Sequence, residues 1–355
     1  MLLVIFGAGA SYDSVPHLLP PSPPSAAQNN FRPVDRRERE PHEDSRPPLA
    51  NQLFDDRKLF VAVMNQYVAC KPLINLLRGD VQVERQLAKF EEDAKTFPPR
   101  RSHLAAIRYY LHHMLWNCQE NWETYHRGIT NHLTFLDAID RWCYKHQEEV
   151  CYVTFNYDTM IERSMSELWG LAFENLDAYI SNSHCKLIKL HGSIDWALEL
   201  KNFPPRATPA EVINDAAELG VSVSEHYRKV VRAPAVFDDG HFGFPALAIP
   251  VENKSEFVCP TEHLAALASV LPKVTKIITV GWRATELHFL TMLKKPLTGL
   301  QRDVDLMVVS GSNDGAKATA NSLAIRESGE KKREFRGYGF SGLIKQIDHL
   351  ESFLA

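Results

Sequence analysis

Two polar motifs follow apolar segments of the chain, and their side chains could do chemistry. Asn156 and Asp158, separated by one tyrosine, follow the apolar residues 150–155, and His191 follows residues 186–190. The amide of Asn156 could hold a water molecule or a ribose hydroxyl, while Asp158 could fix the turn. An imidazole titrates near pH 6.5, so His191 could take a proton at neutral pH. The same residues could also only cap a helix or pack in a core.

A third motif is a turn of small residues near the N-terminus. It consists of Gly7, Ala8, Gly9, Ala10 and Ser11, with Asp13 close behind, and it follows the apolar residues 4–6. Small residues let backbone amides approach a pyrophosphate, so we expect this segment to bind a cofactor. The turn lacks the third glycine of the dinucleotide fingerprint. A proline-rich loop follows it, where a dehydrogenase needs a prompt helix, a second strand and an acid about 20 residues further on to hold a ribose. This argues against a dehydrogenase, although two glycines after a strand can also be only a tight turn.

Two later turns combine glycine with polar or aromatic residues. Gly281 and Trp282 follow residues 276–280, and a turn containing Ser310 and Asn313 follows residues 304–309. Such turns suit the edge of a ribose or an adenine, but they are also ordinary ways to begin a helix.

Strands and helices must position these motifs. Short apolar runs predict strands at 4–6, 150–155, 186–190, 276–280 and 304–309, and helical spacing predicts helices at 159–169, 262–271, 285–295 and 314–327. Alternating strands and helices favour an α/β fold with a mainly parallel sheet and helices on both faces. In such a sheet the carboxyl ends of all strands meet at one edge, so we expect the motifs to gather there.

The chain divides into a core and insertions. We expect residues 1–56 and 150–355 to form the sheet core and residues 57–149 to be a large helical insertion. Nine of the 21 prolines fall in residues 15–48, which predicts a long mobile loop. Residues 199–245 resemble a second insertion, and residues 341–355 have the pattern of an amphipathic helix.

Composition limits the function classes. The chain has 355 residues, is 45% hydrophobic and carries a formal net charge of -4, which predicts a globular protein without a broad surface for nucleic acid or anionic lipid. No apolar run reaches the ~18–20 residues that cross a bilayer, so we expect a soluble, cytoplasmic protein that is not bound to a membrane. The six cysteines have no paired spacing, which predicts reduced thiols and no zinc or other metal site.

Taken in order, four motifs and the proline-rich loop resemble the sirtuin family. The motifs are GAGAS at 7–11, TFNYD at 154–158, KLHGS at 189–193 and VGW at 280–282. They are more similar to the sirtuin-like NADases of bacterial defence systems, and the likeness covers residues 1–56, 150–196 and 275–315. The resemblance implies a Rossmann-like fold and a pocket for NAD.

The resemblance also assigns roles to residues of this chain. It implies that Gly7 to Ser11 meet the phosphates of NAD, that Asn156 lies near the nicotinamide ribose with Asp158 beside it, and that His191 is the catalytic histidine. Gly281 and Trp282 correspond to a turn at a ribose or adenine, and Ser310 to Asn313 are a looser match.

Two departures from deacylating sirtuins shape the expected activity. The chain lacks the paired cysteines of their zinc ribbon, and its loop runs to Arg46 and Pro47 instead of the short stretch that follows their glycine turn. NAD hydrolysis to nicotinamide and ADP-ribose, or to a cyclised product, therefore fits better than deacylation, with the loop 15–48 closing to exclude water. NAD is then a substrate, and no zinc is expected.

Other readings stay open. The chain could be an NAD-dependent deacylase or an ADP-ribosyltransferase, or a scaffold module that senses NAD or ADP-ribose without turnover. The resemblance implies a role in anti-phage defence by NAD depletion and a homo-oligomer. It also implies a possible HerA-like ATPase or Argonaute-type partner, with no direct binding of nucleic acid by this chain.

Overall fold

Short apolar runs form the main sheet. The computed structural model describes residues 1–15, 41–78, 83–249, 257–299, 304–323 and 332–355. Six strands lie side by side in the order β3-β2-β1-β7-β8-β9, and every neighbouring pair is parallel. They are β1 (Leu2–Phe6), β2 (Val150–Thr154), β3 (Cys185–Lys189), β7 (Lys276–Val280), β8 (Asp305–Val309) and β9 (Arg333–Arg336). The strand order reverses between β1 and β7, as in Rossmann-like sheets.

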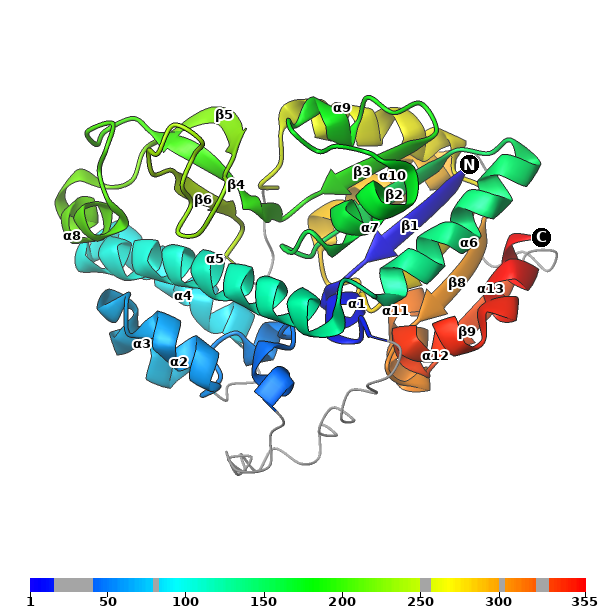
Figure 1. Cartoon of the computed structure of the whole chain (residues 1–355), viewed down its shortest axis with the longest axis horizontal. Helices are drawn as coiled ribbons and strands as arrows, with labels where there is room; N and C mark the ends of the chain where they lie inside the picture. The colour runs from blue at the N-terminus through cyan, green and yellow to red at the C-terminus, as the bar shows by residue number, and fades with distance from the viewer. Residues whose placement is uncertain (16–40, 79–82, 250–256, 300–303, 324–331) are drawn as a thin grey trace.

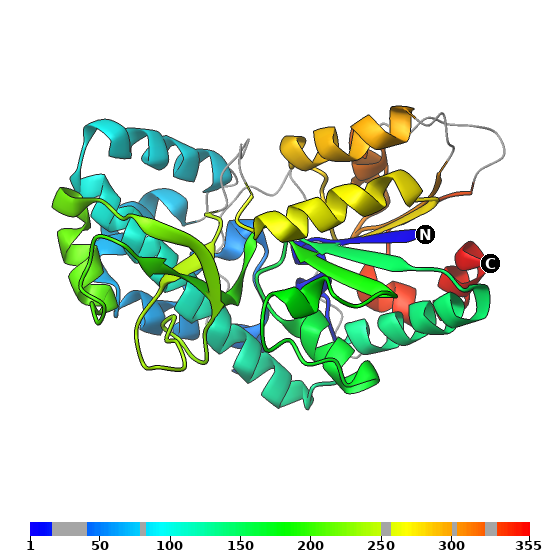
Figure 2. The same ribbon diagram turned by 90° about the horizontal axis from the view of Figure 1, so that it is seen from above.

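Helices cover both faces of the main sheet, which confirms the predicted fold class (Figures 1 and 2). Alternate residues of β1 point to opposite faces, so Val4 belongs to one apolar cluster and Ile5 to the other. One face carries α6 (Asn131–His146), α7 (Met160–Trp169), α12 (Gly339–Lys345) and α13 (Ile347–Leu354). The other carries α9 (Thr261–Val270), α10 (Leu287–Gly299) and α11 (Asn313–Leu323). Residues 324–327 of the predicted helix 314–327 lie outside the described residues.

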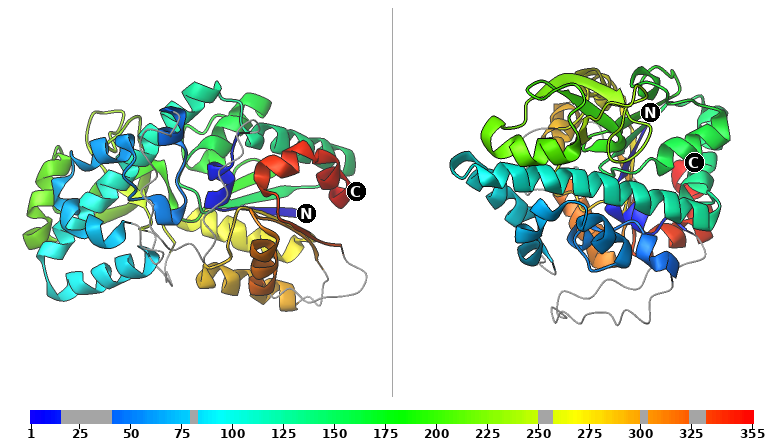
Figure 3. Two further views of the ribbon diagram at one scale, coloured as in Figure 1. Left: turned by 90° about the horizontal axis from the view of Figure 1, so that it is seen from below. Right: turned by 60° about the vertical axis from the view of Figure 1, so that its left-hand side comes forward.

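A second lobe stands beyond the carboxyl ends of the parallel strands (Figures 1 and 3). We define it as the antiparallel sheet β5-β4-β6 with the five helices that share its apolar cluster. The strands are β4 (Gly192–Leu200), β5 (Val223–Lys229) and β6 (Phe244–Leu247), and the helices are α2 (Lys58–Met64), α3 (Lys71–Leu77), α4 (Val83–Thr96), α5 (Pro99–His126) and α8 (Pro209–Leu219). The expected insertion 199–245 thus holds α8, β5 and the start of β6.

The packing of the helices differs from the expected boundaries in two places. α6 falls within the expected insertion 57–149, yet Phe135 and Ile139 pack against the main sheet. The C-terminal residues form α12 and α13, separated at Gln346, where we expected one helix.

Short helical segments complete the structure. They are α1 (Ala8–Tyr12), η1 (Pro41–Ser45), η2 (Ala50–Gln52), η3 (Val68–Cys70), η4 (Asp177–Tyr179) and η5 (Leu271–Lys273). Most of the proline-rich loop, residues 16–40, lies outside the described residues. Its end is packed, because the Arg46 guanidinium is buried 5.3 Å from the Tyr12 ring and 4.9 Å from the Trp122 ring.

The helices and side chains of the described part of the chain bear on a membrane span, a metal site and disulfides. There, no single helix is long and apolar enough to cross a membrane, and only the pair Lys58–Met64 with Val68–Leu77, bent by 102°, meets the test jointly. The described residues also contain no group of three or more His, Cys, Asp or Glu side chains that could hold a metal ion. All six cysteines are free thiols.

A histidine lies in the apolar core beneath β1. The ring of His132 is fully buried, 5.5 Å from the Phe6 ring and 5.2 Å from the Phe340 ring, and neither ring nitrogen has a hydrogen-bond partner among the described residues. Burial lowers the pKa of His132 to about 4, although the negative charge of Asp158 acts to raise it. The folded protein therefore binds this proton less tightly than the unfolded chain. The stability that His132 contributes is present above pH 6.5 and is lost as the pH falls toward 4.

We predict that His132→Phe makes the protein more resistant to acid. The phenylalanine keeps the ring contacts but cannot be protonated. The stability gain of the variant over the parent, measured as the increase in the free energy of unfolding, should be about 2 kcal/mol larger at pH 5 than at pH 7.5. Urea unfolding at the two pH values measures this difference. Equal pH dependence in the two proteins would contradict it.

Candidate active site

The strand order brings the sequence motifs to one edge of the main sheet. The loops after β3, β2, β1, β7 and β8 begin at neighbouring strand ends, because all five strands are parallel and in register. Phe6 lies opposite both Thr154 and Val280, so the loops after β1, β2 and β7 start at the same level. The reversal of strand order between β1 and β7 marks the position where ligands lie in open parallel sheets.

The glycines at this reversal allow two loops to touch. The amide of Gly9 donates to the carbonyl of Gly281 at 3.0 Å, and a Cβ on Gly7 would lie 2.6 Å from the Trp282 Cα. Gly281 has φ +62°, and a Cβ there would lie 2.6 Å from the Gly9 Cα. Glycine is therefore required by close backbone approach as well as by backbone angle.

The same contacts use several amides of the glycine turn. Gly7 donates to Val280 at 3.0 Å, Gly9 donates to Gly281, and Ala10 donates to Gly7 at 2.9 Å. These three amides serve the fold, so any contact of the turn with a pyrophosphate rests on the other groups of the turn, including those of Ala8 and Ser11.

Three predicted site residues form one hydrogen-bonded set. The buried amide of Asn156 donates to the carbonyl of Gly7 at 3.0 Å and to the hydroxyl of Ser11 at 2.7 Å. The Ser11 hydroxyl donates in turn to the carboxylate of Asp158 at 2.5 Å. The other carboxylate oxygen of Asp158 accepts from the amide of Met160 at 3.2 Å, at the start of α7. We call Ser11, Asn156 and Asp158 the polar relay.

Asp13 faces away from the polar relay toward α12. Its carboxylate accepts from both the hydroxyl and the backbone amide of Ser341, the latter at 2.9 Å. Burial raises the pKa of Asp13, while its bonds with Ser341 oppose the rise. In this structure the carboxylate of Asp13 fixes α1 to α12, whereas we expected it to contact a cofactor.

His191 lies between β3 and β4, two residues after β3 ends. Its buried ring is 4.9 Å from the Phe155 ring and 6.3 Å from the Tyr157 ring, the two residues that flank Asn156. Gly192, with φ +80°, follows it, and a Cβ there would clash with the carbonyl of Ala246. The structure thus brings His191 beside the Asn156 segment, while the Asn156 amide points toward Gly7 and Ser11.

The loop after β7 adds an aromatic wall. The Trp282 ring stacks on Phe155 at 5.5 Å with an interplanar angle of 5°, and its indole nitrogen donates to Glu286 at 2.7 Å. Trp282 is buried, so its role in this structure is to pack the loops after β2 and β7 together. The Phe155 ring therefore contacts both the His191 ring and the Trp282 ring.

Ser310 and Asn313 lie one strand further from the polar relay. The backbone of Ser310 accepts from Gly339 and donates to Arg336, each at 2.8 Å, while Asn313 is exposed at the first residue of α11. Among the residues that the structure describes, neither Ser310 nor Asn313 forms a hydrogen bond with Ser11, Asn156 or Asp158.

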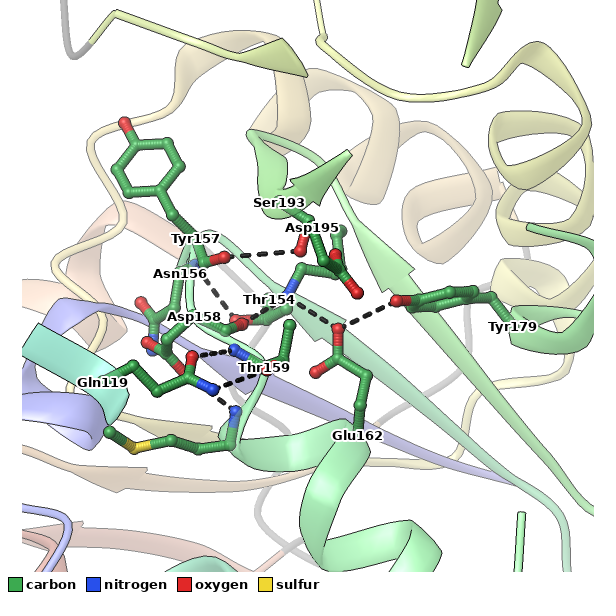
Figure 4. Close-up of polar contacts among 12 residues, drawn as sticks. Gln119, Thr154, Asn156, Tyr157, Asp158, Thr159, Glu162, Tyr179, Ser193 and Asp195 are labelled. Carbon is green, nitrogen blue, oxygen red and sulfur yellow. Dashed lines mark hydrogen bonds and ion pairs between the residues drawn. The ribbon is translucent and has the colours of Figure 1, made fainter. Parts of the chain in front are cut away.

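Sequence reasoning missed the residues that hold the loop after β2 in place. Lys189 ends β3 and is fully buried, where it binds Glu162 of α7 and the backbone carbonyl of Asp158. On α5, the Gln119 side chain exchanges two bonds of 2.6 Å with Thr159 (Figure 4). A lysine within an apolar strand was the available signal for Lys189, since an unpaired buried ammonium is costly.

A small cavity opens beside the start of α7. It has an empty volume of about 210 Å³ and is lined by residues of α5, by Thr159 and Arg163, and by Ile194 and Asp195 of β4. This volume is below the roughly 300–1,000 Å³ of ligand pockets, so the cavity is too small for a dinucleotide.

No model of a known protein family matches the chain, and no curated protein matches it. Among solved structures, the chain is similar to a Sir2 homologue in complex with NAD, at 12% identity and a TM-score of 0.42 over 99% of this chain and 90% of that one. It is also similar to a Sir2 homologue variant in complex with 2′-O-acetyl-ADP-ribose, at 14% identity and a TM-score of 0.43 over 99% of this chain and 93% of that one. For a Sir2 homologue variant in complex with ADP-ribose, the identity is 14% and the TM-score is 0.40 over 99% of this chain and 93% of that one. Likeness at this distance transfers no residue's role to this chain.

Proposed function

We propose that the protein binds NAD at the carboxyl edge of the main sheet and hydrolyses its nicotinamide–ribose bond. The observation that carries the proposal is the polar relay, which joins the loops after β1 and β2 beside the reversal between β1 and β7. Ligands of such sheets lie outside this edge. The motif resemblance to sirtuin-like NADases supplies the choice of NAD.

The reaction needs little more than orientation. The bond between ribose C1′ and the nicotinamide nitrogen breaks, its electron pair leaves with nicotinamide, and a water oxygen bonds to C1′. The water loses one proton, so the products are nicotinamide, ADP-ribose and a proton. In the proposal, Asn156 orients the water or a ribose hydroxyl with Ser11 and Asp158 behind it, and His191 takes the proton.

The remaining predicted residues keep their places in the proposal. The turn Gly7 to Ser11 meets the phosphates, and Gly281, Trp282, Ser310 and Asn313 lie along the ribose and adenine. On the motif resemblance alone, we also propose cytoplasmic anti-phage defence by NAD depletion, a homo-oligomer and a HerA-like or Argonaute-type partner. Equilibrium sedimentation of the purified chain checks the oligomer.

The deciding experiment measures the products. Purified protein is incubated with NAD, with and without acylated peptide and candidate partner proteins, and nicotinamide and ADP-ribose are quantified by chromatography. Hydrolysis releases both compounds without an acceptor. Release only with acylated peptide would instead identify a deacylase, and ADP-ribose attached to protein would identify a transferase. Binding without products in every combination would identify a sensing module.

We predict that His191→Ala lowers the rate of NAD cleavage by about a hundredfold or more, because the proton then has no positioned acceptor. The control is His146→Ala, since the His146 ring also packs on an aromatic ring, Trp142 at 5.7 Å, but lies at the end of α6 just before β2 begins. The control should keep the parental rate. Cleavage by His191→Ala at the parental rate would remove His191 from the mechanism.

A further inference from the structure

A buried lysine supports the polar relay from within the sheet. Lys189 is the last residue of β3 and has no exposed surface, and its ammonium lies 2.8 Å from a carboxylate oxygen of Glu162. The same ammonium donates to the backbone carbonyl of Asp158. Removing an ammonium from water costs several kcal/mol, and a paired carboxylate only partly offsets that cost.

The carbonyl that Lys189 holds belongs to the relay itself. The side chain of Asp158 accepts from Ser11 on one side, while its backbone carbonyl accepts from Lys189 on the other. Asp158 is thus fixed at two points, one on α1 and one on β3. Glu162 lies in the first turn of α7, so the ion pair also fixes the helix that begins after Asp158.

The network continues into the second lobe. The hydroxyl of Tyr179 donates to Glu162 at 3.1 Å (Figure 4). The same hydroxyl receives a bond of 3.1 Å from Lys229 of β5, which pairs with Asp195 of β4. The carboxylate of Glu162 is buried, and its second oxygen has no hydrogen-bond partner among the described residues. Apolar side chains in place of Lys189 and Glu162 would avoid the cost of removing two charges from water. Stability alone therefore does not account for this ion pair.

We propose that Lys189 is a positioning residue, whose ammonium holds the Asp158 carbonyl so that the loop 156–158 keeps Asn156 aligned with Ser11. This inference rests on the proposed function, because the aligned loop is the one assigned to NAD cleavage. Lys189 acts through Asp158 and touches no reacting atom.

The test compares two ion pairs whose lysines both lie in the main sheet. Lys189→Met alone leaves Glu162 buried without its cation, so the single variant should unfold more easily. The double variant Lys189→Met with Glu162→Leu removes both charges and should recover most of that stability. The matched control is Lys276→Met with Asp305→Leu, which removes a 2.9 Å pair that lies at the amino ends of β7 and β8.

The kinetic result separates positioning from stability. In the double variant at Lys189 and Glu162, kcat for NAD cleavage should fall about tenfold or more with KM within threefold, because loop misalignment affects the chemical step more than binding. The control double variant should keep the parental kcat. A parental kcat in the folded Lys189 and Glu162 double variant would overturn the proposal.

A second measurement does not require activity. Amide hydrogen exchange of the segment 154–160, followed by mass spectrometry without substrate, should be at least tenfold faster in the Lys189 and Glu162 double variant than in the parent and the control. Unchanged exchange would overturn the positioning role even if the enzyme is active. If the parent fails to cleave NAD, the proposed function fails, while the exchange result still decides whether Lys189 holds the loop.

Discussion

Replacing Asn156 by alanine is expected to lower the rate of NAD cleavage by about a hundredfold to a thousandfold, the loss typical of removing one positioned hydrogen-bond donor. The side chain donates two bonds, to the Gly7 carbonyl and to the Ser11 hydroxyl. Without them, Ser11 loses the donor that orients it toward Asp158, and the loops after β1 and β2 lose two of the hydrogen bonds that join them. Steady-state release of nicotinamide measures the change.

A second buried asparagine provides the control. Asn131 of α6 also donates two bonds, to the Asp13 carbonyl at 2.6 Å and to the Ser341 hydroxyl at 2.9 Å, and it is fully buried. Asn131→Ala should therefore cost about as much stability as Asn156→Ala, on the order of 1–3 kcal/mol, without the catalytic loss. If both variants lose activity equally, the effect of Asn156 is structural, and its place in the mechanism is wrong.

The positions of the site loops could be predicted because strand ends are visible in a sequence. Each apolar run that became a strand is followed at once by its motif, and a parallel sheet brings such ends to one edge. The contacts within the relay could not be predicted. Ser11 and Asp158 are 147 residues apart, and they meet only because Phe6 of β1 lies in register with Thr154 of β2.

Strands that do not form an apolar run escaped prediction. β9 reads Arg-Glu-Phe-Arg at the edge of the main sheet, and β5 has no fully buried residue, so neither shows the pattern of a core strand. β4 did carry a signal, because apolar residues alternate from Ile194 to Leu200 with period two. Its position directly after His191 obscured that signal.

Asp13 has a long-range contact that the sequence did not indicate. A carboxylate two residues after a glycine turn is a reasonable ligand for a ribose, and nothing nearby in the sequence argues otherwise. Its partner is Ser341, 328 residues away, on a helix that packs against α1. Long-range pairing of this kind depends on the final packing of the helices, which local spacing does not determine.

The second prediction concerns the contact between the loops after β1 and β7. Gly281→Ala should lower the free energy of unfolding by about 3 kcal/mol or more, because the added methyl group meets the backbone of Gly9 and Ala10 and the backbone angle is already left-handed. Neither neighbour is the end of a flexible side chain, so the turn itself must shift. Ser11 moves with it, and NAD cleavage should fall as well.

Gly170→Ala is the matched control for backbone angle. Gly170 ends α7 with φ +64°, almost the angle of Gly281, but a Cβ there would meet nothing within 4 Å. Its substitution should cost about 1 kcal/mol and leave cleavage unchanged, since only the left-handed conformation is penalised. Urea unfolding and nicotinamide release measured on both variants isolate the close approach of the two loops. Equal destabilisation by the two substitutions would mean that the loops separate without cost, and the contact at Gly9 could not then hold the polar relay in place.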